Sequence, residues 1–496
     1  MGTFQRPHFC YNDRMIDEII SERKRKLEHI KEHKVDPYPV ESKRTSTIIS
    51  FLDSFSSNLK SNKKVYIVGR IRGLRDQGKI LFIDIEDESS RIQVILKKDE
   101  IKDFDLFKKT LDIGDFIQIS GKALTTKSGQ KSISADSAKI LSKSLRPIPS
   151  EFYGIENIEL RLRQRYLDSL LSYEVRRMFL KKTLFWKAVR SYLDKEEFME
   201  VETPVLEAIP GGADAEPFIT HYNALDQDFY LRISLEIALK KMLVGGFEKV
   251  YEIGRIFRNE GIDAEHLQDY TQCEFYWAYS DYNKLMKFVE KFFKKVIKET
   301  TGSLTTEWRG IKINWGKKWQ VIDYCAEFKK KTGINPVAAS SDQLHKKAVE
   351  LNLSPERGMS KGRLIDLIYK KTVRPSLIQP SFLINPPAEL VPLAKRMPEN
   401  PGVVERMQVV ACGTELGNGF SEANDPIDQR ERFEEQMKLR DKGDKEAQRL
   451  DEDFIEALEY GMPPAAGFGF SERLFAVLMD KPVRETVFFP AMKKTK

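Results

Sequence analysis

The sequence contains few cysteines and no long apolar run. Its 496 residues include four cysteines, Cys10, Cys273, Cys325 and Cys412, and none belongs to a CxxC pair. This spacing argues against a zinc ribbon and against a disulfide framework. No apolar run approaches the ~20 residues that a membrane-spanning helix needs, and residues 1–15 lack the apolar core of a secretory signal. We therefore expect a cytoplasmic protein without a membrane partner.

Three common catalytic motifs are also absent. The sequence contains no GxxxxGKS or GxxxxGKT, no HExxH and no GxSxG. These absences exclude a P-loop nucleotide site, a zinc-protease helix and a serine-hydrolase elbow. Hydrophobic residues make up 41% and charged residues 32% of the chain, which excludes a disordered chain. Any nucleotide chemistry must therefore use another kind of phosphate site.

The length predicts two to four domains. Residues 1–60 are expected to form an N-terminal helical extension, since the charged segment 14–34 has apolar residues at helical spacing. Residues 61–146 are rich in short β-branched runs, and residues 147–496 mix helices with strands. Two helical patterns predict an insertion at about 341–372. Helices interspersed with antiparallel strands indicate the α+β class.

The strand-rich segment is also the basic part of the chain. About five short strands within 61–146 predict a small closed β-barrel. Between Lys63 and Arg146 there are 18 Lys/Arg and 12 Asp/Glu residues. Small barrels bind single-stranded nucleic acid on an open face with basic and aromatic side chains. A solvated lysine-rich surface explains the charge excess equally well.

Residues 251–279 read as two strands joined by a long loop. In the second strand Cys273, Phe275 and Trp277 alternate with Gln272, Glu274 and Tyr276. The first set is suited to a core and the second to the opposite face. A solvated Glu274 is also compatible with this pattern, because half-buried strands commonly expose one face.

The segment 414–422 repeats this two-faced pattern. Asn418, Phe420 and Glu422 share one face of a regular strand. Glu415 falls on the other face unless a glycine introduces a bulge.

Arginines accompany these strands. Arg258 ends the first strand of the hairpin, Arg473 opens the last predicted helix, and Glu236 lies near the start of another helix. Arginine forks bind phosphates well, although for each arginine taken alone an ordinary surface or structural ion pair is the favoured interpretation. With no obvious nucleophile present, these groups favour catalysis by positioning and electrostatics, as nucleotidyl transfer requires.

At these residues the chain resembles a class II aminoacyl-tRNA synthetase, specifically the bacterial type of lysyl-tRNA synthetase. The resemblance runs from about residue 16 to Met492. It is carried by FMEVETPVL (198–206, motif 1), FRNEG (257–261) with the following strand (motif 2), and GFGFSERL (467–474, motif 3). It implies an N-terminal OB barrel joined to an antiparallel catalytic sheet flanked by helices. It also implies a lysine–tRNA ligase that uses ATP and Mg²⁺.

The resemblance implies a role for each site residue. The ATP site would contain Arg258, Glu260, His266, Tyr270, Glu415 and Arg473, with Arg258, Arg473 and Glu415 as the catalytic group. Lysine would be bound by Glu236, Glu274, Tyr276, Asn418, Phe420 and Glu422. Mg²⁺ would be held by Glu415, with Gln408 and Glu422 as weaker ligands. The pocket chemistry agrees, because lysine brings two ammonium groups that need acceptors.

The resemblance also implies macromolecular partners. The barrel would read the anticodon of tRNA(Lys) through Arg70, Arg72, Phe82 and Gln93, and core packing is the alternative for Phe82. Motif 1, marked by Pro204, would form the interface of a homodimer.

Some residues depart from the pattern of this family. Gln408 stands where a second metal-binding glutamate is usual, and the segment from Pro464 to Arg473 is one residue shorter than usual. Leu267 and Gln130 are lesser departures. Gln408 keeps open the alternative of a non-catalytic RNA-binding homologue. An aspartyl- or asparaginyl-type synthetase is disfavoured by Glu274 and Glu422, and a paralogue that lysylates a protein is disfavoured by the barrel segment 61–146.

Overall fold

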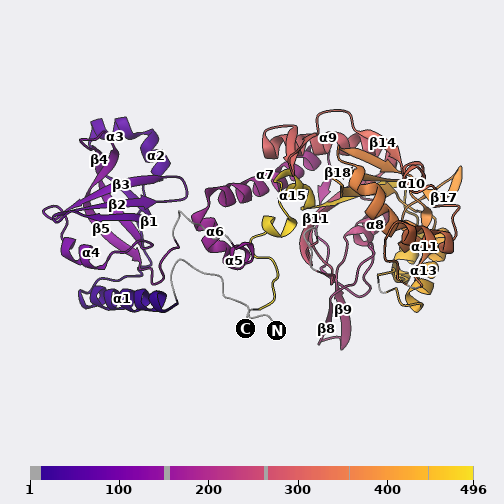
Figure 1. Ribbon diagram of the computed structural model, residues 1–496, viewed down its shortest axis with the longest axis horizontal. Helices are drawn as coiled ribbons and strands as arrows, with labels where there is room; N and C mark the ends of the chain where they lie inside the picture. The colour runs from indigo at the N-terminus through magenta and orange to yellow at the C-terminus, as the bar shows by residue number, and fades with distance from the viewer. Residues whose placement is uncertain (1–12, 150–156, 262–265, 357, 445, 495–496) are drawn as a thin grey trace. The chain divides into compact units, whose positions relative to one another are not determined.

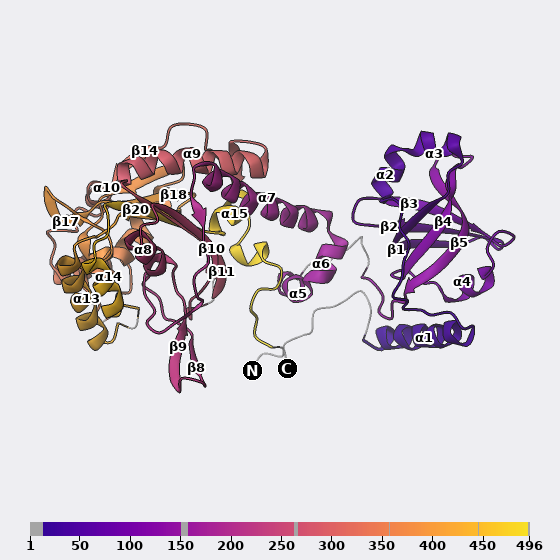
Figure 2. The ribbon, with the colours of Figure 1, turned by 180° about the vertical axis from the view of Figure 1, so that it is seen from behind.

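The chain folds into two compact units, residues 1–161 and 162–496 (Figures 1 and 2). The computed structural model describes residues 13–149, 157–261, 266–356, 358–444 and 446–494. Within these ranges no helix combines the length and apolar character that a membrane crossing requires. The units divide near residue 161, whereas the sequence suggested a boundary at residue 146, and our domain limits stay predictions.

The first unit contains a closed five-stranded barrel with the strand order β1-β2-β3-β5-β4. The strands are β1 (Val65–Asp76), β2 (Ile80–Glu86), β3 (Arg91–Lys97), β4 (Phe116–Thr125) and β5 (Lys131–Ser142). Alternate residues of β2, namely Leu81, Ile83 and Ile85, are buried inside the barrel. This period of two directs the intervening side chains outward. The predicted small barrel is confirmed.

Helices cover this barrel. They are α1 (Asp13–Glu32), α2 (Ile48–Asp53), α3 (Phe55–Ser61) and α4 (Phe104–Thr110). Ile30, Ile48 and Phe55 belong to the same apolar core as the barrel strands. The Arg23 guanidinium of α1 also donates to the carbonyl oxygens of Ile113 and Arg146, both at 3.0 Å. The helices before β1 are therefore built into the barrel unit.

The second unit is organised around an eight-stranded sheet with the order β14-β15-β18-β19-β20-β11-β10-β6. These strands are β6 (Met199–Glu200), β10 (Lys249–Phe257), β11 (Asp269–Ala278), β14 (Gln320–Asp323), β15 (Ser381–Ile384), β18 (Arg406–Ala411), β19 (Thr414–Ser421) and β20 (Ala465–Ser471). All neighbours are antiparallel except the two edge pairs, β14 with β15 and β10 with β6. The predicted α+β class is confirmed.

Aromatic side chains cover one face of this sheet. Helix α9 (Tyr282–Thr301) begins at Asp281, whose side chain accepts from two backbone amides, and ends before Gly302, which has a φ of 81°. Its apolar residues recur at helical spacing and pack with α7 (Tyr173–Lys195) and α15 (Arg473–Leu478). The rings of Phe293 and Phe470 lie 5.4 Å apart, in edge-to-face contact. Polar groups of the sheet are consequently left to its other face.

Shorter elements complete the second unit. The helices are α5 (Ile158–Arg163), α6 (Arg165–Leu171), α8 (Glu236–Val244), α10 (Tyr324–Thr332), α11 (Ser341–Glu350), α12 (Lys361–Ile368), α13 (Pro426–Asp441) and α14 (Glu452–Glu459). There are also a short π-helix, η1 (Tyr369–Val373), and three 3₁₀ helices, η2 (Arg374–Ser376), η3 (Ala388–Leu390) and η4 (Val483–Thr486). The small sheets contain β7 (Leu206–Glu207), β8 (Ile219–Tyr222), β9 (Gln227–Leu231), β12 (Thr305–Trp308), β13 (Ile311–Asn314), β16 (Arg396–Met397) and β17 (Asn400–Val404). Figure 1 shows β8 and β9 as a projecting hairpin.

Candidate active site

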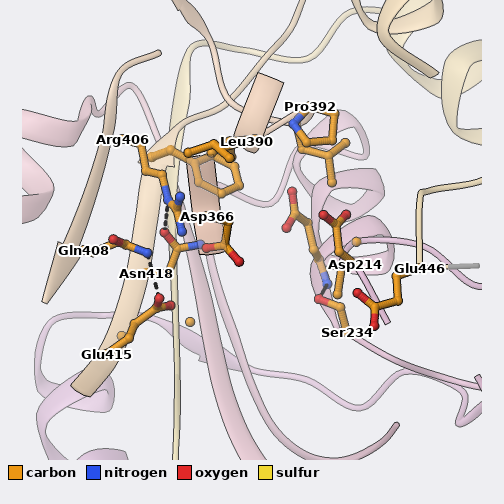
Figure 3. Close-up of a pocket in the computed structure, with 18 of the residues that line it drawn as sticks. Asp214, Ser234, Asp366, Leu390, Pro392, Arg406, Gln408, Glu415, Asn418 and Glu446 are labelled. Carbon is orange, nitrogen blue, oxygen red and sulfur yellow. Dashed lines mark hydrogen bonds between the residues drawn. The ribbon is translucent and has the colours of Figure 1, made fainter. Parts of the chain in front are cut away.

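A cavity of about 690 Å³ lies against the polar face of the large sheet. Figure 3 shows part of its lining. Most of the site residues that we predicted for the second unit line it, namely Glu236, Arg258, Glu260, His266, Tyr270, Glu274, Tyr276, Gln408, Glu415, Asn418, Phe420 and Arg473. The fold therefore brings together residues separated by more than two hundred positions.

Glu274 of β11 is buried in the cavity wall rather than solvated. Its side-chain oxygens accept from Ser234 Oγ at 2.7 Å and Gln272 Nε2 at 2.6 Å. They also accept from the Leu235 amide at 3.0 Å and Tyr276 Oη at 2.9 Å. Four donors to one carboxylate stabilise its charged form. The two-faced reading of this strand is thus correct, and the solvated alternative for Glu274 is wrong.

A β-bulge sets the orientation of Glu415. Glu415 lies opposite Val410, and Asn418 lies opposite Gln408, so β19 has one residue more than β18 between these pairs. The additional residue is Leu416. Because of it, Glu415 and Asn418 face the same side of the sheet. A bulge was the condition for Glu415 to share this face, and a bulge is present, but the expectation that Gly417 or Gly419 would form it is wrong, because the extra residue is Leu416.

Gln408 and Glu415 point toward one another across the paired strands (Figure 3). Gln408 Nε2 donates to Glu415 Oε2 at 2.6 Å, and Tyr369 Oη donates to Gln408 Oε1 at 3.4 Å. Burial raises the pKa of Tyr369 and so keeps its hydroxyl a donor. The amide nitrogen of Gln408 therefore faces Glu415, while its amide oxygen accepts from Tyr369, the first residue of the π-helix η1.

Two arginines bring positive charge to the cavity. Arg258 donates through Nε and Nη2 to the Ile233 carbonyl oxygen, both at 3.3 Å. Burial disfavours its charge, but neighbouring Tyr270 and Glu260 outweigh burial, and the pKa of Arg258 is raised. Arg473 Nη1 donates to the Glu415 carbonyl oxygen at 3.4 Å. The two guanidiniums thus reach one cavity from different elements, Arg258 just after β10 and Arg473 at the start of α15, as binding of a polyphosphate requires.

A buried lysine joins two of the predicted lysine-binding glutamates. Lys240 Nζ lies 2.5 Å from Glu236 Oε1 and 2.5 Å from Glu422 Oε2. Burial raises the pKa of Glu236 to about 7 and that of Glu422 well above its usual range, although Lys240 acts in the opposite direction on both. Glu422 therefore pairs with Lys240, and its assignment as a weak metal ligand stays a prediction.

Glu422 is not among the residues that line the cavity. Its Oε1 is buried without a hydrogen-bond partner among the described residues. A Cβ on Gly467, which does line the cavity, would come 2.5 Å from this oxygen and 2.3 Å from Tyr276 Cε1. A side chain at Gly467 would clash with both, so glycine leaves room beside the unpartnered oxygen.

The barrel presents its predicted contacts on the outside. Phe82 lies opposite Arg75, outside the apolar core, with the Arg75 guanidinium 5.8 Å from the ring centroid. The Arg70 guanidinium lies 4.2 Å from the ring centroid of Phe116. Core packing of Phe82 is therefore wrong. The exposed Arg75 is a residue that we missed, because strict alternation places it on the face opposite Arg70, and only the register shift between Ile71 and Gly73 brings it opposite Phe82.

The other two predicted barrel contacts are more enclosed. Arg72 Nε lies 3.3 Å from Glu86 Oε2. Gln93 is buried, and its Oε1 accepts from Ser132 Oγ at 3.1 Å. Pro204, in the second unit, is exposed beside the exposed apolar side chains of Val205 and Leu206. Lys240 also escaped the sequence analysis, although a glutamate four residues before a lysine is a known helix pairing.

Comparison with known proteins agrees with this geometry. The family described as tRNA synthetases class II (D, K and N) matches residues 157–493, and the OB-fold nucleic acid binding domain matches residues 65–141. The chain belongs to the class II tRNA synthetases. The OB match covers the barrel strands, and the synthetase match covers the cavity of the large sheet.

Similar synthetases are known from several bacteria. The chain is 42% identical to the lysine–tRNA ligase of Carboxydothermus hydrogenoformans over 96% of its own length and 98% of that protein. It is 41% identical to the lysine–tRNA ligase of Moorella thermoacetica, over 96% and 98%. It is 42% identical to that of a Roseiflexus species, over 96% and 99%.

Proposed function

We propose that this synthetase is a lysine–tRNA ligase. It would activate L-lysine with ATP to give lysyl-adenylate and pyrophosphate, and would then transfer lysine to the 3′-terminal adenosine of tRNA(Lys). The observation that carries the substrate assignment is the buried, unpartnered Glu422 Oε1 beside the cavity. A buried carboxylate oxygen without a donor is costly, and an ammonium group at the end of the substrate would supply the donor.

The sign of the pocket charge separates lysine from the substrates of related synthetases. Three glutamates, Glu236, Glu274 and Glu422, gather at this pocket, and Lys240 pairs with two of them. Arg258 lies close enough to Glu274 for the two charges to interact. Such a pocket repels aspartate and offers acceptors to two ammonium groups. The names of the similar proteins support the same choice.

Activation follows from positioning. Arg258 would bind the lysine carboxylate and the α-phosphate, which brings the attacking oxygen to phosphorus. As that oxygen bonds to the α-phosphorus, the bond to pyrophosphate breaks, and Arg258 and Arg473 stabilise the charge that moves onto the phosphates. Glu260, His266 and Tyr270 would surround the nucleotide, and Glu236 would accept from the α-ammonium group of lysine.

Transfer uses the same cavity. The 3′-hydroxyl of tRNA would attack the carbonyl carbon of lysyl-adenylate, and AMP would leave. The lysine side chain would be held during both steps by Glu274, Tyr276, Asn418 and Phe420. Of these, the carboxylate of Glu274 is already fixed in place by four hydrogen-bond donors.

The residues present fit Mg²⁺ only in part. Glu415 would hold an ion that arrives on the phosphates, and Mg²⁺ is commonly bound through one carboxylate and substrate oxygens. Gln408 donates to Glu415, and the described residues include no cluster of three or more His, Cys, Asp or Glu able to hold a metal. When bound, Mg²⁺ would neutralise phosphate charge, but Gln408, the side chain that meets Glu415, brings no charge of its own.

The remaining parts of the proposal concern partners and location. The barrel would contact the unpaired anticodon bases through Arg70, Arg72, Phe82 and Gln93. The exposed apolar residues around Pro204 support a homodimer through motif 1. The three cysteines that the structure describes are free, as in a reducing cytoplasm.

Amino-acid-dependent ATP–pyrophosphate exchange tests the proposal. Purified protein is assayed with each of the twenty amino acids, and lysine alone is expected to support exchange. Charging of tRNA(Lys) is then measured with radiolabelled lysine. Exchange with aspartate or asparagine would replace the substrate assignment. No exchange from a folded protein that binds tRNA would favour a non-catalytic RNA-binding homologue, the alternative that the Gln408–Glu415 pair keeps open.

A further inference from the structure

The buried Lys240 has no place in the mechanism described above. Its side chain is completely buried on the inner face of α8. Its ammonium lies between Glu236 and Glu422, and the ring centroids of Phe420 and Phe454 lie 5.4 and 5.9 Å away. In such apolar surroundings charge interactions are strong and poorly screened. An internal cation therefore holds two of the glutamates that the substrate would use.

Lys240 pairs with one oxygen of each glutamate. Lys240 contacts Oε1 of Glu236 and Oε2 of Glu422. The other oxygen of Glu422 has no hydrogen-bond partner among the described residues. Because both contacts are 2.5 Å, the two held oxygens lie no farther apart than twice that distance. A single nitrogen thus sets the spacing between the acceptor for the α-ammonium and the acceptor for the side-chain ammonium.

Lys240 also contributes to the charge of the pocket. Glu236, Glu274 and Glu422 bring three carboxyl groups, and the ammonium of Lys240 pairs with two of them. Lysine brings two ammonium groups, and its carboxylate is assigned to Arg258. Without Lys240, Glu236 and Glu422 would repel each other and separate, and the substrate would have to reassemble the pocket.

We infer that Lys240 is a positioning residue that determines substrate specificity, because its ammonium fixes the spacing and the net charge of the two ammonium acceptors. This inference rests on the proposed lysine–tRNA ligase function. It assigns Lys240 no contact with the reacting atoms, so the expected effect is on lysine binding and not on the chemical step.

The test measures binding of L-lysine and of ATP by titration calorimetry on the full-length protein. Lys240→Met removes the charge and keeps most of the volume. We expect the Kd for lysine to rise about 30-fold or more, since breaking a buried ion pair leaves charges uncompensated. The Kd for ATP should stay within about threefold. Discrimination between L-lysine and the shorter L-ornithine should also decrease, since the acceptor spacing is no longer held.

A matched control and a rescue separate charge from packing. Lys241→Met removes the neighbouring lysine, which pairs with Asp453 at the surface, and should leave lysine binding unchanged. Lys240→Ala deletes the equivalent of propylammonium. Added n-propylammonium should restore lysine binding to this variant, whereas neutral 1-propanol should not. If Lys240→Met does not fold, Lys240→Gln, which keeps a donor without the charge, is expected to show the same loss.

The outcomes distinguish the two levels of the proposal. Wild-type protein that binds no lysine overturns the proposed function itself. Wild-type protein that binds lysine, together with a Lys240→Met variant that binds it equally well or more tightly, overturns the role of Lys240 alone. Equal rescue by 1-propanol would likewise reduce Lys240 to a packing residue.

Discussion

In the barrel, Arg72 pairs with Glu86, and the Arg75 guanidinium lies near the ring of Phe82. In the large sheet, Glu422 keeps a buried oxygen without a donor among the described residues, and Arg258 lines an open cavity. Both regions are antiparallel structures with one polar face. The barrel, however, partners its polar groups with one another, while the sheet holds some of them ready for a ligand.

This difference reflects the two kinds of ligand. Long nucleic acids are bound through many weak, largely exposed contacts. In the free protein, each side chain that makes such a contact can pair with a neighbouring side chain instead. A small charged substrate must be recognised by a few buried groups whose desolvation is compensated only on binding. Substitutions in the sheet should therefore affect activation of lysine, and substitutions in the barrel should affect only transfer to tRNA.

The largest effect is expected from Arg258→Ala. It removes a guanidinium placed for both the carboxylate and the α-phosphate, and it should lower kcat/KM for ATP–pyrophosphate exchange by about 10³-fold. Exchange and tRNA charging should fall together. If exchange fell less than about tenfold while charging was lost, the contrast between the two units would be wrong.

Glu422→Gln should act on lysine selectively. The amide keeps the size of the side chain but loses its charge, so the KM for lysine should rise about 10- to 100-fold. The KM for ATP should change little. Glu459→Gln, at an exposed position of α14, is the matched control. An equal rise in both KM values would indicate general disruption rather than a lysine contact.

Phe82→Ala sharpens the comparison from the side of the barrel. Loss of one stacking ring should raise the KM for tRNA(Lys) about 5- to 100-fold and leave lysine-dependent exchange unchanged. Thermal melting should also be nearly unchanged, because Phe82 lies outside the barrel core. Reduced exchange in this variant would contradict the separation of functions.

Gln408→Glu is expected to have the smallest effect, on stability and metal dependence. Two facing carboxylates would replace the present hydrogen bond of 2.6 Å, so melting in EDTA should shift down by about 2–4 °C. Added Mg²⁺ should restore the melting temperature. The variant should also bind Mn²⁺ more tightly than the wild type, as measured by electron paramagnetic resonance. Gln130→Glu, at an exposed barrel position, should show neither change. Insensitivity to EDTA would mean that Glu415 does not hold a metal.

Local patterns in the sequence were sufficient for much of the fold. The period of two along β11 predicted that Cys273, Phe275 and Trp277 face a core, and all three side chains pack in the core cluster on one face of the sheet. The two helices of the insertion were recognisable from their spacing and begin at serine caps, Ser340 and Ser360. These features depend on neighbours a few residues apart, which the sequence displays directly.

The site was predictable in composition but not in arrangement. The glutamates and arginines could be chosen by type and by their resemblance to a family. Three contacts could not be predicted from the sequence. Glu274 is held by Ser234 from another segment, Leu416 forms a bulge, and Tyr369 orients Gln408. Each of these contacts joins residues whose registers are set by packing elsewhere in the sheet.

The sequence by itself therefore determined the classes of structure, the faces of single strands and the family. Only the tertiary structure decided that Lys240 joins Glu236 to Glu422 and that Glu415 turns toward Gln408. The physical reason is range. Periodicity and capping act within a few residues, whereas a buried charge is stabilised by whatever partner the fold brings within about 3 Å, however distant in the chain.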